Sequence, residues 1–416
     1  MSPNLRIALR FLTAKKRAML MSLSCTVLGV GLFIVTQATT NGFENLFKRT
    51  LIGSDGAMRI EDKVQDTLRS MEAAHGSYFK FGQKEGVKYI EGVEQPEEIM
   101  KAVRQFDSVQ GVSAIVRGNV QASSSFKTED AQVYGIRLED HLRVSDLERQ
   151  VPTPGALARF RESPDAALVG RVLADRLQLE VGQTFVIAAH GASRRYHVAG
   201  IYETGYREID RIRIFLPWNE ARSLLKKPTG ASFIQISLKP DAIDLAPREA
   251  ARMAEILHHS VRPWQEREQP WLAAFAALRI ASAITVSIFT LIASLAMFNT
   301  LAMIVLEKTK DIAILRSMGY ERRDITQIFL WQAGVVLAVG AVLGALFGAV
   351  VTEIVGRLPL PITGIFKTEV FPVLSEPRHY FEAILTAAIM VMIASLVPAR
   401  RAARLEPGDI IRGTAQ

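Results

Sequence analysis

The segment IASAITVSIFTLIASLAMFNTLAMIVL, residues 280–306, contains no charged residue and decides what kind of protein this is. Arg279 precedes the segment and Glu307 follows it, so the uncharged stretch has sharp ends. About 20 consecutive apolar residues are enough for a helix to cross the hydrocarbon core of a membrane. The segment therefore predicts a transmembrane helix.

Three further segments have the same character, namely residues 18–43, 325–352 and 383–398. Lys15, Lys16 and Arg17 precede the first segment like the basic start of a secretory signal. The apolar stretch is too long for a signal peptide, however, and no small-residue cleavage motif follows it. We therefore expect a retained anchor and four transmembrane helices in total.

The composition agrees with a chain that is partly in a membrane and partly outside it. A hydrophobic content of 49% and a mean hydropathy of +0.16 are too apolar for an ordinary soluble protein, whereas 22% charged residues are too many for a purely embedded one. The net charge of +8 comes from basic residues beside the apolar segments, without interleaved aromatic residues. We therefore do not expect a nucleic-acid partner.

Chemistry-bearing motifs are missing from the sequence. Cys25 is the single cysteine and lies in the first apolar segment, and the seven histidines form no metal-binding motif. The sequence contains no GxxxxGK[ST] phosphate-binding loop. We therefore expect no catalytic residue, metal or cofactor in this chain, which would not be an enzyme and would need a partner for any work driven by ATP.

Lysine and arginine gather in three segments, residues 1–17, 307–324 and 399–416, and are sparse in residues 353–382. Basic residues near a span resist translocation, so basic segments tend to stay in the cytoplasm. This pattern predicts that both termini and residues 307–324 are cytoplasmic. Residues 44–279 and the loop 353–382 would then lie on the outer side.

Residues 44–279 show the mixed pattern of a folded α+β domain. We expect a helix at residues 171–177 and a hairpin formed by residues 184–189 and 195–202, turning at His190 and Gly191. Residues 61–95 are polar and have no clear period. The predicted fold class is thus a membrane α-helical protein with four transmembrane helices and an inserted extracytoplasmic α+β domain.

A cluster of polar residues follows Gly205 and comprises Tyr206, Arg207, Glu208 and Asp210. A pair of carboxylates can act in acid–base catalysis, but charges in surface turns usually pair with each other without a catalytic role. We favour a salt-bridged turn over a paired-carboxylate site.

The connection between the second and third spans reads EKTKDIAILRSMGYERRDITQIF, residues 307–329. At helical spacing, Ile312, Leu315 and Met318 share one face, and Gly319 would end the helix. This amphipathic helix could rest on the inner membrane surface or dock into a partner protein. In the third span, Gly340, Gly344 and Gly348 are four residues apart, a spacing that lets another helix pack closely.

Four motifs carry a family resemblance: NGF (residues 41–43), GIYETGYREID (200–210), EKTKDIAILRSMGYERRDI (307–325) and PARRAARLEPGDIIR (398–412). Through these motifs the chain resembles the FtsX-like ABC permeases, and most of all the lipoprotein-releasing (Lol) permeases of Gram-negative inner membranes. The resemblance extends over nearly the whole chain. The second motif is the one that points to the lipoprotein branch.

The resemblance implies that residues 311–319 form a coupling helix inserted into a groove of a cytoplasmic ATPase. The coupling residues would be Asp311, Ile312, Ile314, Leu315, Arg316, Met318 and Gly319. Two permeases, identical or homologous, would assemble with two ATPases, which bind ATP and magnesium.

The resemblance also implies that a lipoprotein enters between the first and second spans and is passed to a periplasmic carrier. The cargo cavity would be lined by Val35, Asn41, Phe43 and Phe298. One alternative is the export of another amphiphile, such as a glycolipid or a hydrophobic drug. A second is a transducer that moves nothing and controls a cell-wall hydrolase.

Overall fold

A computed structural model describes residues 3–14, 16–63, 92–362 and 368–404. The chain divides into two compact units. The helical unit comprises residues 1–45, 273–360 and 369–416, and the α+β unit comprises residues 46–272 and 361–368. Most of the polar stretch 61–95 lies outside the described residues.

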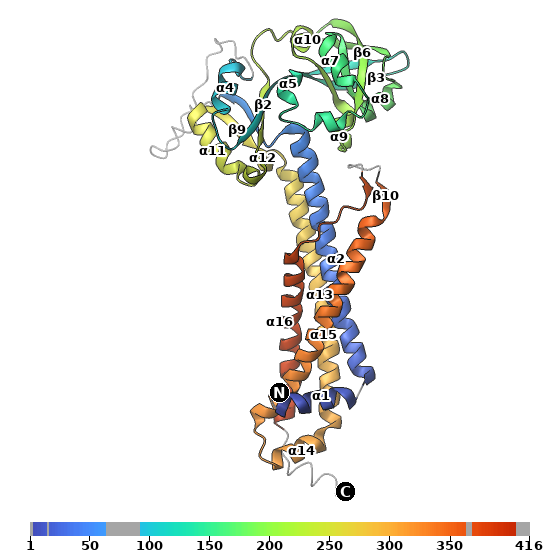
Figure 1. The fold of residues 1–416 in the computed structure, drawn as a ribbon, viewed down its shortest axis with the longest axis vertical. Helices are drawn as coiled ribbons and strands as arrows, with labels where there is room; N and C mark the ends of the chain where they lie inside the picture. Colours follow the sequence, from blue (N-terminus) through green and yellow to red (C-terminus); the bar gives the residue numbers. More distant parts are fainter. Residues whose placement is uncertain (1–2, 15, 64–91, 363–367, 405–416) are drawn as a thin grey trace, which may run out of the picture. The chain divides into compact units, whose positions relative to one another are not determined.

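Four long apolar helices dominate the helical unit, as predicted (Figure 1). They are α2 (Lys16–Asp55), α13 (Gln269–Glu307), α15 (Arg322–Arg357) and α16 (Pro377–Ala403). Each contains one of the uncharged segments and extends beyond it. The backbone hydrogen bonds of a helix do not stop at the first charged residue, so an uncharged window marks the membrane crossing and not the helix ends.

Two shorter helices accompany the long ones, α1 (Pro3–Ala14) and α14 (Thr309–Ser317). Helix α1 was not expected from the sequence. It buries Ala8, Phe11 and Leu12 in a core shared with α13, α15 and α16. Asn4 Nδ2 also donates to Gln327 Oε1 on α15 at 3.1 Å.

Three glycines of α15, Gly340, Gly344 and Gly348, lie against α2. A Cβ atom added to Gly340 would lie 2.8 Å from Thr26 Cγ2, and one added to Gly344 would lie 2.8 Å from Val30 Cβ. A Cβ atom added to Gly348 would lie 3.0 Å from Ile34 Cβ. These distances are shorter than ordinary side-chain contacts, so the two helices approach this closely only because the three positions lack side chains.

The α+β unit contains a nine-stranded sheet with the order β3-β7-β4-β6-β5-β2-β8-β1-β9. Its strands are β1 (Met58–Lys63), β2 (Val109–Ser123), β3 (Thr128–Ile136), β4 (Ala166–Gly170), β5 (Thr184–Ala189), β6 (Ala192–Tyr202), β7 (Arg213–Pro217), β8 (Phe233–Leu238) and β9 (His259–Pro263). The first six strands of this order begin with β3 and end with β2, and these two strands also pair with each other. The six strands therefore form a closed barrel.

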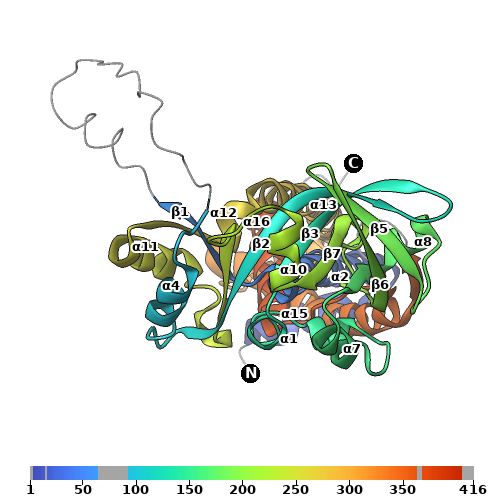
Figure 2. The same ribbon diagram turned by 90° about the horizontal axis from the view of Figure 1, so that it is seen from above.

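Strand β2 belongs to both parts of the sheet. Residues 109–115 pair with β8, and residues 116–123 pair with β3. Figure 2 shows β2 running between the barrel and the smaller part of the sheet, where β1, α4 and α11 lie. A single long strand therefore connects the barrel to the smaller sheet.

Short helices cover the two parts of the sheet. They are α4 (Pro96–Val103), α5 (Leu138–His141), α6 (Leu147–Gln150), α7 (Ala156–Glu162), α8 (Arg171–Leu177), α9 (Arg207–Ile212), α10 (Trp218–Leu224), α11 (Ala246–Leu257) and α12 (Trp264–Arg267). Helix α8 and the β5–β6 hairpin lie where the sequence predicted them. At the hairpin turn, His190 and Gly191 have φ of 50° and 77°, as such tight turns require.

Candidate functional site

Helix α14 is the candidate coupling element, and one of its faces is buried in the chain's own core. Ile312 and Ala313 are 1% and 5% exposed, and Ile312 belongs to the core that α1, α13, α15 and α16 share. Leu315 is half-buried against the same core. The face that we predicted to be continuous from Ile312 to Met318 is therefore divided, because neighbouring helices already cover its first part.

The outward surface of α14 is apolar at two positions. Ile314 is 58% exposed and Met318 is 73% exposed, with the exposed Ser317 between them. The helix ends at Ser317, and Gly319 follows with φ of +98°, a conformation that suits glycine. Exposed apolar side chains on a short protruding helix suit an apolar groove in another protein.

Polar contacts fix α14 to its surroundings. Lys308 Nζ lies 2.8 Å from Asp311 Oδ2 and 5.5 Å from the ring centre of Phe11 on α1. Arg316 Nη1 donates to the backbone oxygen of Ala403, at the end of α16, at 3.4 Å. A force applied to α14 would therefore be transmitted to α1 and α16 as well as along the chain.

Within this chain, the four predicted cargo residues lie in two separate places. Asn41 Nδ2 lies 2.6 Å from His379 Nε2 on α16, and the ring of Phe43 packs edge-on against Phe371 at 5.1 Å between ring centres. Asn41 and Phe43 therefore face α16 and the segment that precedes it.

Val35 and Phe298 lie on different surfaces from this pair. Val35 continues an exposed apolar stripe on α2 that includes Leu28 and Leu32, at helical spacing. Phe298 continues a similar stripe on α13 that includes Leu291 and Leu295. Both half-buried residues therefore lie at the edge of surfaces that are open to lipid or to another protein.

Helices α2 and α13 of the same chain pair along their length. Ser22 Oγ donates to Met297 Sδ at 3.2 Å, a Cβ atom on Gly29 would lie 3.8 Å from Ala293 Cβ, and Arg279 Nη2 lies 2.7 Å from Glu44 Oε2. A large molecule can enter between these two helices only if they separate.

The polar cluster after Gly205 lies mostly in helix α9, so the turn that we predicted for these residues is wrong. Asp210 is 2% exposed and accepts hydrogen bonds from Thr204 N at 2.9 Å and Thr204 Oγ1 at 2.8 Å. Burial raises the pKa of Asp210 above its usual value. The neighbouring Glu208 is exposed and pairs with Arg211 at 2.7 Å. The two carboxylates thus have separate partners, Arg211 for Glu208 and Thr204 for Asp210, which is not the arrangement of a paired-carboxylate site.

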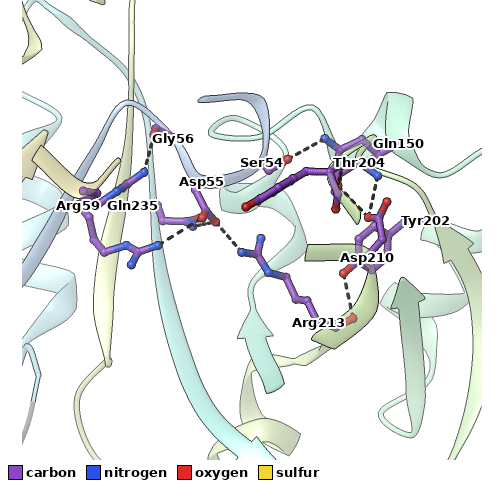
Figure 3. A network of polar contacts seen from close by, with 12 residues as sticks. Ser54, Asp55, Gly56, Arg59, Gln150, Tyr202, Thr204, Asp210, Arg213 and Gln235 are labelled. Carbon is purple, nitrogen blue, oxygen red and sulfur yellow. Dashed lines mark hydrogen bonds and ion pairs between the residues drawn. The ribbon is translucent and has the colours of Figure 1, made fainter. Parts of the chain in front are cut away.

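A buried polar network at the end of α2 was missed in the sequence (Figure 3). Asp55 Oδ1 lies 2.9 Å from Arg213 Nη2 on β7 and 3.2 Å from Gln235 Nε2 on β8. Arg59 on β1 approaches the other oxygen of Asp55 at 3.6 Å. The last residue of α2 is therefore bonded both to the barrel and to the smaller sheet. Arg213 and Gln235 are too far from Asp55 in sequence for a local pattern to reveal these contacts.

Within the described residues, no group of three or more His, Cys, Asp or Glu side chains is placed so that it could hold a metal ion. The sites described above can bind apolar surfaces and transmit movement between elements.

Comparisons with known proteins cover both units. Residues 19–252 match the model of the MacB-like periplasmic core domain, and residues 283–407 match that of the FtsX-like permease C-terminal region. The lipoprotein-releasing system transmembrane protein LolC of Xylella fastidiosa (strain 9a5c) is 24% identical over 440 residues, which cover 98% of each chain. The ABC transporter permease YknZ of Bacillus subtilis (strain 168) is 24% identical over 430 residues, again 98% of each chain. The solved periplasmic region of MacB from Actinobacillus actinomycetemcomitans is 12% identical with a TM-score of 0.36, over 55% of this chain and 97% of that one.

Proposed function

Because the chain belongs to the FtsX-like permeases with a MacB-like periplasmic core domain, we propose that it is the membrane subunit of a lipoprotein-releasing exporter. Members of this family are permease subunits of ABC transporters, and such a permease works with a cytoplasmic ATPase. The similarity to LolC over 98% of both chains is the observation that carries the lipoprotein assignment.

Coupling to the ATPase takes place through α14. Ile314 and Met318 insert into an apolar groove of the ATPase, and Ile312 and Leu315 pass the movement into the helical core. Asp311, Arg316 and Gly319 hold the shape and position of the helix through the contacts and backbone conformation described above. ATP and magnesium bind to the two ATPase subunits, and ATP binding there moves α14.

The proposed location is the bacterial inner membrane, with both termini in the cytoplasm. The basic segments before α2, between α13 and α15 and after α16 support this orientation, since lysine and arginine resist translocation. The α+β unit then lies in the periplasm, where a carrier receives the cargo.

A lipoprotein enters the membrane region from the side, in an assembly with a second, identical or homologous permease. The exposed stripes that end at Val35 and Phe298 support this path, because acyl chains need an apolar surface. The pairing of α2 with α13 within one chain favours entry between α2 of one permease and α13 of the other.

The second candidate is export of a different amphiphile by the same mechanism. It is favoured by the relative named macrolide export ATP-binding/permease protein MacB, of Sodalis glossinidius, which is 25% identical over 217 residues. That match covers 50% of this chain and 31% of that protein. A drug or glycolipid would use the same exposed apolar stripes.

The deciding experiment identifies what the assembled complex holds. The tagged chain is purified from its own membranes, and bound proteins and lipids are identified by mass spectrometry before and after addition of ATP and magnesium. We expect an ATPase, a second permease and an acylated protein that ATP releases, while the chain without its ATPase hydrolyses no ATP. A complex that holds the ATPase and another amphiphile, without acylated protein, would instead support the second candidate.

A further inference from the structure

The first turns of α15 and the last turns of α16 lie at one end of the helical unit (Figure 1). Together they line a pocket of about 450 Å³. Its lining residues are Arg322, Arg323, Thr326, Gln327, Arg400, Ala403 and Arg404, and we call it the arginine pocket. A volume of this size suits a small ligand, for which sites of about 300–1,000 Å³ are usual. The pocket lies on α15 and α16 and is therefore separate from the proposed cargo path on α2 and α13.

Four guanidinium groups surround this small volume. All four arginine side chains are exposed, and within the described part of the chain none forms an ion pair with a carboxylate. The adjacent acidic residues, Glu321 and Asp324, are bonded to backbone N–H groups in the capping box that starts α15. Positive charges gathered around one pocket repel each other, so a ligand with several anionic oxygens would be stabilised there.

Apolar side chains continue the pocket along the same helix faces. Trp331 is 47% exposed and lies four residues after Gln327 on α15. Val397 and Ile393 are 47% and 64% exposed and lie three and seven residues before Arg400 on α16. Residues at these spacings share a helix face, and tryptophan favours the boundary between lipid tails and headgroups.

We propose that the arginine pocket binds the phosphate headgroup of an anionic phospholipid, whose acyl chains lie along Trp331, Val397 and Ile393. The guanidinium groups donate to the phosphate oxygens, and Thr326 and Gln327 supply further polar contacts. Basic residues are common at this end of membrane helices, but general attraction to an anionic membrane needs neither a pocket nor an apolar path leading from it. Bound lipid would hold the start of α15, directly after α14, against the end of α16.

The test compares two double variants that remove equal charge. Arg323→Gln with Arg400→Gln changes the arginine pocket, whereas Arg6→Gln with Arg401→Gln removes two exposed arginines that do not line it. The complex with its ATPase is incubated with mixed micelles of phosphatidylglycerol or of phosphatidylcholine with the same acyl chains, and retained lipid is measured by native mass spectrometry. Thermal midpoints show that both variants are folded. If the double substitution in the pocket does not fold, the single variants Arg404→Gln and Arg401→Gln replace the two double variants, so that the charge removed stays equal.

We expect the pocket variant to lose phosphatidylglycerol affinity by about tenfold or more, since each basic side chain contributes about 1 kcal/mol to binding anionic lipid. The control variant should retain phosphatidylglycerol, and phosphatidylcholine retention should not change in either. Equal losses in both variants would overturn the proposal, because only diffuse charge would then matter. Displacement by inorganic phosphate alone would contradict a lipid ligand, and loss of the ATPase with unchanged lipid retention would identify a protein-docking surface instead.

Discussion

His141 is a buried residue whose ring lies among charged groups of the α+β unit. Its side chain is 1% exposed, and its ring centre lies 5.2 Å from that of Phe215. Burial, followed by the positive charge of Arg213, lowers the pKa of His141 from 6.5 to about 3, although the carboxylate of Asp55 acts in the opposite direction. The imidazole is therefore neutral in the folded protein across the physiological pH range.

This environment predicts that the α+β unit loses stability in mild acid. Below about pH 6.5 the unfolded chain binds a proton at His141, whereas the folded chain does not. The contribution of the neutral His141 to the free energy of unfolding is therefore fully present above that pH and decreases below it. At about pH 5 the free energy of unfolding should be about 2 kcal/mol lower than at neutral pH. Thermal unfolding of the purified chain at about pH 7.5 and about pH 5 measures the effect, and His141→Phe should reduce the difference between the two midpoints.

The control for this prediction is His190→Asn, which removes an exposed histidine from the same unit at a left-handed position that asparagine tolerates. It should leave the pH dependence as in the wild type. A His141→Phe protein with the full wild-type pH dependence would show that other groups cause the acid sensitivity.

Met318 gives the cleanest test of coupling, because it is 73% exposed and its replacement leaves the core intact. Met318→Asp should fold and insert but lose stimulation of the ATPase, since a buried charge without a partner costs several kcal/mol in an apolar groove. ATPase activity and the retention of the ATPase on the purified permease measure this. Leu315→Asp is a poorer test, because Leu315 also packs against the core.

The matched control is Met318→Leu, which keeps an apolar side chain and should keep coupling. Wild-type ATPase stimulation and transport in the Met318→Asp complex would rule out a docking role for this position.

At the scale of elements, the contact between α15 and α2 depends on side chains that are absent. Gly344→Ala would place a Cβ atom 2.8 Å from Val30 Cβ and 3.0 Å from the backbone oxygen of Val27. The backbone of a helix cannot shift at one residue alone, so α15 must move away from α2. This movement should lower the free energy of unfolding by about 1–3 kcal/mol. We expect a lower thermal midpoint and weaker transport for Gly344→Ala.

Gly334→Ala provides the comparison on the same helix, because no atom lies within 4 Å of the Cβ position at Gly334. Alanine also favours helix more than glycine does, so this variant should be as stable as the wild type or slightly more stable. Equal destabilisation by the two substitutions would indicate that helix propensity, and not the packing of α15 on α2, determines the result.

At the scale of the whole molecule, the proposed cargo path predicts that a charge on the exposed stripe of α2 blocks binding. Val35→Arg should still insert, since an arginine in a span costs only about 2.5–3.5 kcal/mol on insertion scales. Acyl chains should avoid the charged surface, so the purified complex should hold less lipoprotein while basal ATPase activity persists. Phe298→Arg tests the stripe on α13 in the same way.

Leu346→Arg is the control, because Leu346 is 59% exposed on α15 and lies two residues from both Gly344 and Gly348, on the side away from α2. It should retain its cargo. If Val35→Arg and Phe298→Arg both keep full cargo occupancy, lateral entry along these stripes is wrong.

Local patterns in the sequence were enough to predict the membrane helices, their number and several elements of the α+β domain. The four uncharged segments each lie within one long helix, and the β5–β6 hairpin turns at His190 and Gly191. These features depend on residues that are close in the chain, such as an apolar run or a turn with positive φ. Helix α1 was missed because Arg6 and Arg10 interrupt its apolar residues. It therefore contains no uncharged segment of the kind from which the membrane helices were predicted.

By itself, then, the sequence determined the membrane class, the short helix between the second and third spans, and the glycine stripe, because each depends on residues a few positions apart. Only the tertiary structure decided which residues of these segments are available to a partner. It buries Ile312 while exposing Ile314 and Met318, bonds Asp55 to Arg213, and places the arginines of α15 beside those of α16. These outcomes depend on contacts between residues far apart in the chain, and such contacts form only when the helices and strands pack together.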